Sequence, residues 1–424
     1  MAIELRRGLS PVREALSNGA VLLVQQTSMA PAVTIECAFD AGSLFDPVDL
    51  PGVSQLVGRV LDRGSVRRSA SAISDALEDR GVALRVTTTR HRLSVSCTCL
   101  TEDFPDVLAI LLDVARRPVF PESEIEQPRA ETVTALRQDE DNPAVRAVDA
   151  ASALIYGADH PYARKAKGTF SSVERIHRTD LLAFHAAWVR PSCLTLVIVG
   201  DVEPTMALSL AAAELDDWSA PPADHVPVTP PGAIALRRIR RIAMPGKSQS
   251  DIAYGFNTIR RLDPRYYAYW MMNNVLGQFG LGGRLADNIR ERQGMAYYVY
   301  STFDASVGEG PLLVRAGVDP ANVERTIEAI DREVRTLAFD GPTEAEISET
   351  REYLVGSIPR LLENNPGIAA FLLMTEQYGL GLDYDRRLPA LLRAVNPDEI
   401  HAAAGSLDPG AASIAVAGPV DDDR

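Results

Sequence analysis

Cysteine and histidine, the usual protein ligands of zinc, are scarce in this sequence. The 424 residues include four cysteines and six histidines, and no two histidines stand four residues apart, as they would around a metal on one helix face. Cys97 and Cys99 share one face of an expected strand and could bind a metal, but no second cysteine pair supports them. Like Cys37 and Cys193, they are better interpreted as small buried hydrophobic residues.

Positive charge is in deficit, because 43 Lys and Arg residues face 57 Asp and Glu residues, which gives a net charge of −14. Nucleic acids and anionic membranes bind basic surfaces, so this balance argues against both as partners. A short basic cluster, Arg237–Arg241, is interpreted as a strand edge or a feature of a domain interface.

Long hydrophobic runs are absent as well. The apolar stretch Leu194–Val199 is far shorter than the roughly 20 residues of a membrane-spanning helix. Residues 1–18 contain three arginines but lack the apolar segment of a secretory signal. We therefore expect a cytoplasmic protein.

The order of expected elements repeats along the chain. Composition is globular, and the length favours at least two domains. Three short matches occur in the same order in both halves, separated by a nearly constant number of residues. Phe39 and Asp46-Pro47 match Phe256 and Asp263-Pro264, Arg80-Gly81 matches Gln293-Gly294, and Val199–Val202 matches Ala417–Val420. This self-similarity predicts a duplication. Residues 1–216 and 236–424 would be two homologous domains, joined by a proline-rich linker over 217–235.

In the first half, apolar patterning and turn residues predict four strands and four helices. The expected strands are Ala20–Gln25, Val33–Phe39, Val82–Thr88 and Arg92–Leu100. The expected helices are Pro51–Asp62, Ser69–Arg80, Glu102–Arg117 and Glu122–Gln138. Thr101 is expected to cap the third helix, and the fourth is expected to start in the main at Pro128.

The stretch from Gly277 to Phe303 is the most informative of the second half. It predicts a glycine-rich loop over Gly277–Gly283, a helix over Leu285–Arg292 ended by Gly294, and a strand over Met295–Phe303. A glycine loop before a helix can bind phosphate, but this spacing fits neither a P-loop nor a dinucleotide fingerprint. Arg290 and Tyr297, seven residues apart, could instead point into one cavity.

The duplicated frame, the helix–glycine–strand units and the proline-rich joint resemble the pitrilysin/insulinase-type metallopeptidases over nearly the whole chain. The resemblance implies an α+β fold of two homologous α/β-sandwich domains. Each would have a mixed or antiparallel sheet with helices packed on it, and together they would form half of a clam-shell. In this family the first helix of the zinc half carries H-x-x-E-H, and a further Glu about 80 residues on completes the site.

The equivalent stretch here, Gly52–Ser65, keeps the frame but not the chemistry. Gln55 stands at the first histidine, Gly58 at the glutamate and Arg59 at the second histidine. Ala135 is the residue nearest to the last ligand position. These residues cannot hold a dication, so we predict no zinc in this chain.

The second-half motif is retained, from Gly283-Arg284-Leu285 through Arg290 to Gly294-Met295-Ala296-Tyr297, with Gly283 in place of the usual serine. The resemblance implies that Arg290 and Tyr297 donate hydrogen bonds to a substrate carbonyl and the developing oxyanion. Their counterparts in the first half are Leu77 and Leu84, which are interpreted as core residues. Alternatively, Arg290 complements the helix dipole and Tyr297 is a packed aromatic.

Gly280, Gly282 and Gly283 are expected to line a substrate chamber, with a flexible connector as the alternative. The resemblance predicts the non-zinc subunit of a heterodimeric peptidase for unfolded peptides, inactive alone, whose homologous partner brings H-x-x-E-H and zinc. Peptides would add to an exposed strand edge. The alternatives are an inert structural or peptide-binding homologue and an unrelated protein with a nucleotide on the glycine loop.

Overall fold

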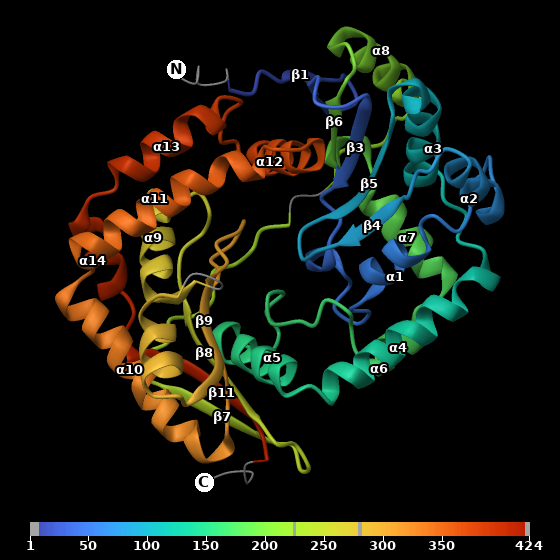
Figure 1. The fold of residues 1–424 in the computed structure, drawn as a ribbon. Coiled ribbons are helices and arrows are strands. Elements are labelled where there is room, and N and C mark those ends of the chain that lie inside the picture. The colour runs from blue at the N-terminus through green and yellow to red at the C-terminus, as the bar shows by residue number, and fades with distance from the viewer. Residues whose placement is uncertain (1–7, 224–225, 279–281, 420–424) are drawn as a thin grey trace. The chain divides into compact units, whose positions relative to one another are not determined.

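The computed structural model describes residues 8–223, 226–278 and 282–419. The chain forms two compact units, and each contains segments of both halves of the sequence (Figure 1). Unit 1 consists of Met1–Leu136, Lys165–Val226 and Ile358–Arg387. Unit 2 consists of Arg137–Arg164, Pro227–Ser357 and Leu388–Arg424.

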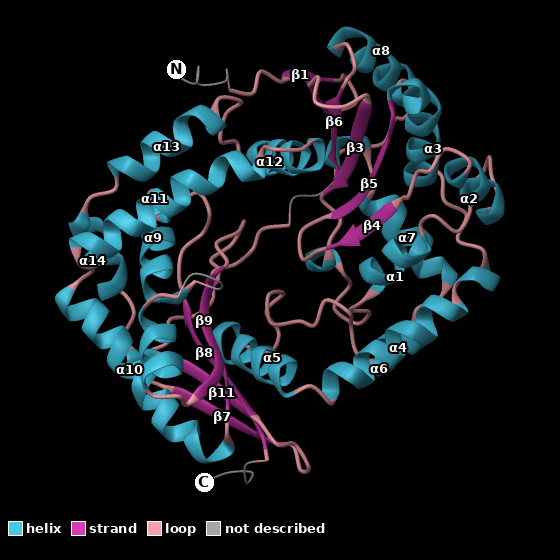
Figure 2. Ribbon diagram, viewed as in Figure 1, coloured by secondary structure: helices cyan, strands magenta, loops and turns pink. Residues whose placement is uncertain are grey.

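Within the described residues, unit 1 is built on a six-stranded sheet with the order β1-β2-β6-β3-β5-β4 (Figure 2). Its strands are β1 (Val12–Ala15), β2 (Val21–Gln26), β3 (Ala32–Phe39), β4 (Arg85–Thr88), β5 (Leu93–Leu100) and β6 (Leu194–Gly200). β2 and β6 run parallel, and the other neighbours run antiparallel. The sheet is therefore mixed, and β1 and β4 form its edges.

Helices cover both faces of this sheet. Side chains alternate along β2 and β6, and one set joins a large core with helices α1 (Val53–Val60), α3 (Phe104–Arg116), α7 (Arg178–Trp188) and α8 (Pro204–Leu215). The other set packs on Ile368, Ala369, Leu372 and Leu373 of α12 (Asn365–Gln377). Because β6 is buried along its whole length, its sequence is almost continuously apolar, with Thr195 as the one polar residue, rather than alternating.

Unit 2 repeats this design with a sheet of order β7-β11-β8-β10-β9. Its strands are β7 (Arg238–Ala243), β8 (Ser250–Asn257), β9 (Ala296–Phe303), β10 (Pro311–Val318) and β11 (Ser413–Gly418). β7 and β11 are parallel and the remaining neighbours antiparallel, so order and direction match β2-β6-β3-β5-β4 of unit 1. The predicted α+β fold with two duplicated, helix-covered mixed sheets is confirmed.

The helices of unit 2 also lie on both faces of their sheet. α9 (Tyr266–Gly277), α10 (Val323–Asp340) and α14 (Pro397–Gly405) pack together, while α5 (Pro143–Tyr156) covers β8 and β11 on the opposite side (Figure 1). The remaining helices of the chain are α2 (Ala70–Glu78), α4 (Glu126–Glu140), α6 (Phe170–Arg175), α11 (Glu344–Leu361) and α13 (Tyr384–Ala394). None of the helices within the described ranges has the length and apolar character that a membrane crossing requires.

Helices α5 and α12 are exchanged between the halves of the chain. α5 comes from the first half but belongs to unit 2, whereas α12 comes from the second half and belongs to unit 1. Both begin in the same way: Asn142 accepts hydrogen bonds from the amides of Ala144 and Val145, Asn364 accepts one from Gly367, and a proline follows in the first turn. Each sheet therefore owes the cover of one face to the other half of the sequence.

Two predicted helix starts in the first half are wrong. Thr101 does not cap α3, because Thr101–Asp103 form a 3₁₀ turn and the helix proper begins at Phe104. α4 begins at Glu126, so Pro128 lies inside its first turn, where the missing amide hydrogen is not needed. Between α8 and β7 the described residues form no helix or strand.

Candidate functional site

Helix α1 carries three of the four residues assigned to the predicted zinc positions, Gln55, Gly58 and Arg59. The carboxylate of Asp46 accepts hydrogen bonds from the amides of Gly52 and Ser54, at 2.6 and 2.9 Å, and so fixes the start of the helix. Gln55 and Arg59 stand one turn apart and share a face. The amide of Gln55 is already engaged, because its Nε2 donates to the carbonyl of Thr88 at 2.9 Å.

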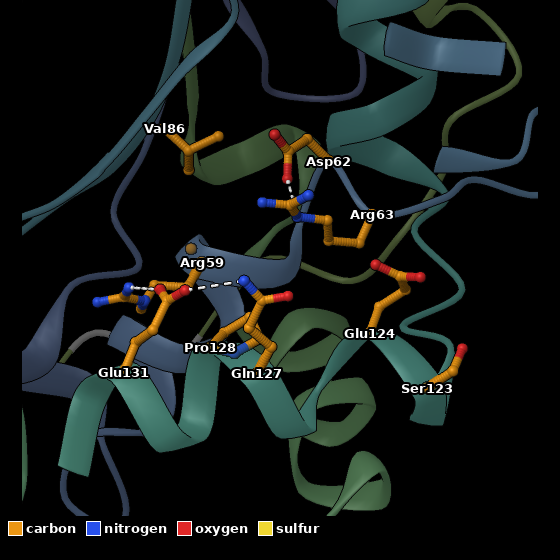
Figure 3. Close-up of a pocket in the computed structure, with 10 residues that line it drawn as sticks. Arg59, Asp62, Arg63, Val86, Ser123, Glu124, Gln127, Pro128 and Glu131 are labelled. Carbon is orange, nitrogen blue, oxygen red and sulfur yellow. Dashed lines mark hydrogen bonds and ion pairs between the residues drawn. The ribbon is translucent and has the colours of Figure 1, made fainter. Parts of the chain in front are cut away.

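Arg59 points to α4, where its guanidinium forms an ion pair with Glu131 (Figure 3). Gln127 Nε2 also donates to Glu131 Oε1, at 3.1 Å. Hydrogen bonds from Gln127 and Arg59 hold the pKa of Glu131 below its ordinary value. These residues line an open pocket of about 340 Å³, together with Gly58, Asp62, Arg63, Val86, Ser123, Glu124 and Pro128.

Glu131 is the acidic residue that sequence reasoning missed. It lies one helical turn before Ala135, which is half-buried. The assignment of Ala135 to the last ligand position stays a prediction, but the carboxylate that contacts the α1 face comes from Glu131. The available signal was a carboxylate four residues earlier on the same helix face.

Gly58 closes the position that corresponds to the family's glutamate. A Cβ atom there would lie 2.4 Å from Thr88 Oγ1 and 3.3 Å from Leu93 Cδ1, so β4 leaves no room for a longer side chain. An engaged amide, a guanidinium and a glycine do not fit zinc. Across the described residues, no three His, Cys, Asp or Glu side chains are grouped closely enough to hold a metal ion.

Cys97 and Cys99 behave as buried small residues. Burial raises the pKa of the Cys97 thiol to about 12 and that of Cys99 to about 11, so the thiolate forms that bind metals are disfavoured. The basic cluster is a strand edge, as predicted: β7 is an edge strand, Arg237 pairs with Asp331 at 2.7 Å, and Arg241 pairs with Glu324.

In unit 2, the glycine-rich loop is only partly described. Gly280 lies outside the described residues, whereas Gly282 and Gly283 have left-handed backbones with φ of +88° and +86°. A Cβ at Gly283 would lie 2.8 Å from Gly277 Cα, so this glycine is required for the close packing of the loop on itself. A chamber-lining role for these glycines stays a prediction.

The helix after the loop is a π-helix, η5 (Ala286–Arg292), and Gly294 ends it with a left-handed φ of +62°. Leu285 and Ile289 anchor it in the core. Arg290 is exposed, and its Nε donates to the neighbouring Glu291 at 2.8 Å. The wider helical turn was not predictable from the sequence, but such turns are frequent at functional sites.

Tyr297 is 85% exposed at the start of β9, an edge strand of its sheet. Ala296 pairs with Val318 and Tyr298 with Gly317, so Tyr297 is the extra residue of a β-bulge. It is therefore not one of the packed aromatics. The amide of Gly294 donates to the carbonyl of Arg290 at 3.1 Å, so the short segment that connects Arg290 to Tyr297 is tightly held.

In the corresponding helix–glycine–strand segment of the first half, the side chains at these two positions are apolar and point into the core. Leu77 on α2 is 4% exposed and Leu84 is partly buried, and both pack in the main core of unit 1. The interpretation of these two residues as core is confirmed. The fold of this unit therefore does not require an arginine and a tyrosine at the positions of Arg290 and Tyr297.

Two family models match the chain. The model described as Insulinase (Peptidase family M16) matches residues 21–159, and the model described as Peptidase M16 inactive domain matches residues 175–354. The chain belongs to peptidase family M16, the insulinase family. The M16 model over the first half includes α1, the helix that carries Gln55, Gly58 and Arg59.

Relatives cover nearly the full length of this M16 chain. An uncharacterized zinc protease of Streptomyces coelicolor is 24% identical over 426 residues, covering 99% of this chain and 92% of that protein. A non-peptidase homolog, YmxG of Helicobacter pylori, is 23% identical and covers 90% and 87%. A crystal structure of a peptidase M16 inactive domain from Pseudomonas fluorescens is 25% identical, with a TM-score of 0.91 and coverage of 98% and 99%.

Proposed function

We propose that this chain is the non-zinc subunit of a heterodimeric M16 peptidase that acts on unfolded peptides in the cytoplasm. A homologous partner would carry H-x-x-E-H and zinc. Arg290 and Tyr297 would act on the substrate held by that partner, as donors of hydrogen bonds to the carbonyl under attack. Such preorganised donors lower a barrier because they stabilise charge that develops only in the transition state.

The observation that carries this proposal is the contrast between the two copies of one unit. The zinc positions hold an engaged glutamine, a glycine without space for a side chain and an arginine tied to Glu131. Arg290 and Tyr297 are exposed in a copy whose counterparts, Leu77 and Leu84, are buried or partly buried. An exposed tyrosine on a strand bulge, beside an arginine that no core contact requires, is suited to a ligand outside the chain.

Peptide binding in extended form is compatible with the sheets. Among the described residues β4 and β9 are edge strands: no strand neighbours the outer side of β4, and the outer side of β9 meets only an isolated bridge between Gln278 and Ser301. An extended peptide can add to such an edge through main-chain hydrogen bonds, which gives affinity with little sequence preference. β4 lies beside the pocket around Arg59, to which it contributes Val86.

The test starts with co-purification of the chain from its native source, followed by metal analysis of the complex. We expect the purified chain to cleave no peptide, and the complex to cleave peptides with zinc bound in the partner. Tyr297→Phe should lower kcat of the complex about 100-fold, because one oxyanion donor is lost. Tyr353→Phe, on the partly exposed Tyr353 of α11, serves as the matched control. Peptide cleavage by the chain alone, with stoichiometric zinc, contradicts the proposal.

A second candidate is an inert structural or peptide-binding homologue. The name of the Helicobacter pylori relative and the pairing of Arg290 with the adjacent Glu291 favour it. On this alternative Tyr297→Phe and Arg290→Ala have no effect on any activity of the complex. An adjacent reading frame that encodes a similar chain with H-x-x-E-H favours the heterodimer.

A further inference from the structure

Three residues form a row across three neighbouring strands beside the bulge in unit 2. Tyr298 on β9 pairs with Gly317 on β10, and Gly317 pairs with Asp251 on β8. Side chains at paired positions of adjacent strands lie on the same face of a sheet. Tyr298 and Asp251 therefore stand on either side of a residue that has no side chain.

The ring of Tyr298 fills the space over Gly317. A Cβ at Gly317 would lie 2.5 Å from Tyr298 Cε1 and 2.5 Å from Gln249 Nε2. The backbone of Gly317 is not left-handed, so the close approach of the ring, and not the conformation, is what requires a glycine here. An aromatic ring laid over a strand glycine is a known means of fixing strand register.

Across this glycine, Tyr298 reaches the carboxylate of Asp251. Its Oη donates to Oδ1, and Gln249 Nε2 donates to Oδ2 at 3.2 Å. Asp251 is 4% exposed, so the bond is shielded from water. Burial and the hydrogen bond to Asp251 raise the pKa of the Tyr298 hydroxyl, which keeps it protonated as a donor. Hydrogen bonds to a buried charged group are among the stronger ones in proteins.

The bulge decides where Tyr297 points. Val299 and Ser301 are buried on the helix-covered face of β9, and Ser301 Oγ donates to the carbonyl of Asn273 on α9. In a regular strand Tyr297 would point to that same face, because side chains alternate. Tyr297 is instead 85% exposed, at the position where the bulge interrupts the alternation.

We propose that Tyr298, Gly317 and Asp251 form a clamp that holds the bulge at residue 297 and so positions Tyr297 for catalysis. The inference rests on the proposed function of Tyr297. Two adjacent tyrosines stand at the start of β9, and a shift of the bulge by one residue would exchange their roles. The clamp stabilises the register of the structure, in which Tyr298 lies over the glycine and bonds to the carboxylate while Tyr297 is left at the bulge. Tyr298 is thus a positioning residue.

The described residues of the unit 1 sheet form no such clamp. The residues that correspond to Gly317 and Asp251 by pairing are Thr98 and Thr34, whose hydroxyls bond to each other at 2.9 Å. β4 pairs with β5 only from Arg85 to Thr88, opposite Ser96 to Leu93, so it does not reach this row. The clamp lies in the sheet of unit 2, which is also the unit that carries Arg290 and Tyr297.

The first test uses the full chain alone and measures backbone hydrogen exchange over residues 295–299. Tyr298→Phe removes only the hydroxyl, and we expect exchange to rise about tenfold. Gly317→Ala should have a similar effect, because its Cβ displaces the ring of Tyr298. The double variant Gly317→Ala/Tyr298→Phe should differ little from either single variant, since both substitutions break the same contact between Tyr298 and Asp251. Asp251→Asn keeps an oxygen that accepts the hydroxyl and should stay closer to the parent than Asp251→Ala. Unchanged exchange in Tyr298→Phe, or equal effects of the two Asp251 variants, overturns the clamp.

The second test uses the complex with the co-purified zinc subunit and a peptide substrate. Tyr298→Phe should lower kcat about tenfold with KM nearly unchanged, because Tyr297 is misplaced while peptide binding persists. If Tyr297→Phe lowers kcat and Tyr298→Phe does not, the positioning role is wrong and the proposed function stands. If Tyr297→Phe has no effect, the proposed function fails, and the positioning role for catalysis fails with it.

Discussion

The helix–glycine–strand unit occurs once in each compact unit, and its two copies have opposite surfaces. In unit 1, α2 runs into Gly81 and the short strand β4, and Leu77 and Leu84 turn inward. In unit 2, η5 runs into Gly294 and the longer, bulged β9, and Arg290 and Tyr297 turn outward. Each copy runs from a helix through a left-handed glycine into a strand, and this shared path accommodates buried or partly buried leucines in one copy and exposed polar residues in the other.

A second comparison concerns the α-helices that follow β3 in unit 1 and β8 in unit 2. α1 approaches β4 so closely that Gly58 has no space for a side chain. In unit 1 the helix that carries Gln55, Gly58 and Arg59 packs closely on β4, while in unit 2 Arg290 and Tyr297 stay exposed. The following predictions are directed at this contrast.

The largest effect on the free energy of unfolding is expected when the arginine of unit 2 is introduced at the corresponding buried position of unit 1. Leu77→Arg places a charge at a site that is 4% exposed and should cost about 3 kcal/mol of the free energy of unfolding. The reciprocal Arg290→Leu should change it by less than about 0.5 kcal/mol. Chemical denaturation of the two variants measures both, with Leu77→Met as the volume-conserving control. Equal costs for the two exchanges would contradict the contrast.

A smaller effect is expected at the closed helix. Gly58→Ala gains about 1 kcal/mol of helix propensity but meets Thr88 Oγ1, and overpacking typically costs about 1–3 kcal/mol. We expect a net loss of about 1 kcal/mol. In a Thr88→Ala background the obstacle is gone, and the same substitution should become neutral or stabilising. A double-mutant cycle by denaturation measures this coupling, and additive effects would show that Thr88 is not the obstacle.

The smallest effect is expected at Arg59 and Glu131, because both side chains are exposed. The pKa of Glu131 is lowered in the folded chain, so the pair stabilises the fold above the ordinary value of 4.5, and this contribution disappears as pH falls through the folded pKa. The difference in Tm between the parent and Arg59→Met should therefore be small at pH 7, begin to fall below pH 4.5 and vanish once the pH is below the folded pKa of Glu131. Arg59→Lys keeps the charge as a control. A difference that grows on acidification would show that the pair is not ionic.

Much of the fold could be predicted from patterning and repeats. Local sequence predicts the strands around Val33–Phe39 and Arg92–Leu100 and the helix ends at Gly81 and Gly294. It also predicts the shared order of elements in both halves. The π-helix, the bulge at Tyr297 and the exchange of α5 and α12 could not be predicted, because they depend on tertiary pairing. Glu131 was missed for the same reason. Its meeting with Arg59 depends on how α4 packs on α1.

The exchange of α5 and α12 has a consequence for how the chain is made. A ribosome completes β6 by Gly200, yet the helix that covers one face of that sheet is not synthesised until residues 365–377. The nascent first half must therefore wait with Leu23, Ala38 and Val197 uncovered, because this face of its sheet is covered through contacts that are distant in sequence. We expect the first half produced alone to aggregate or recruit chaperones, and a separately supplied second half to restore it.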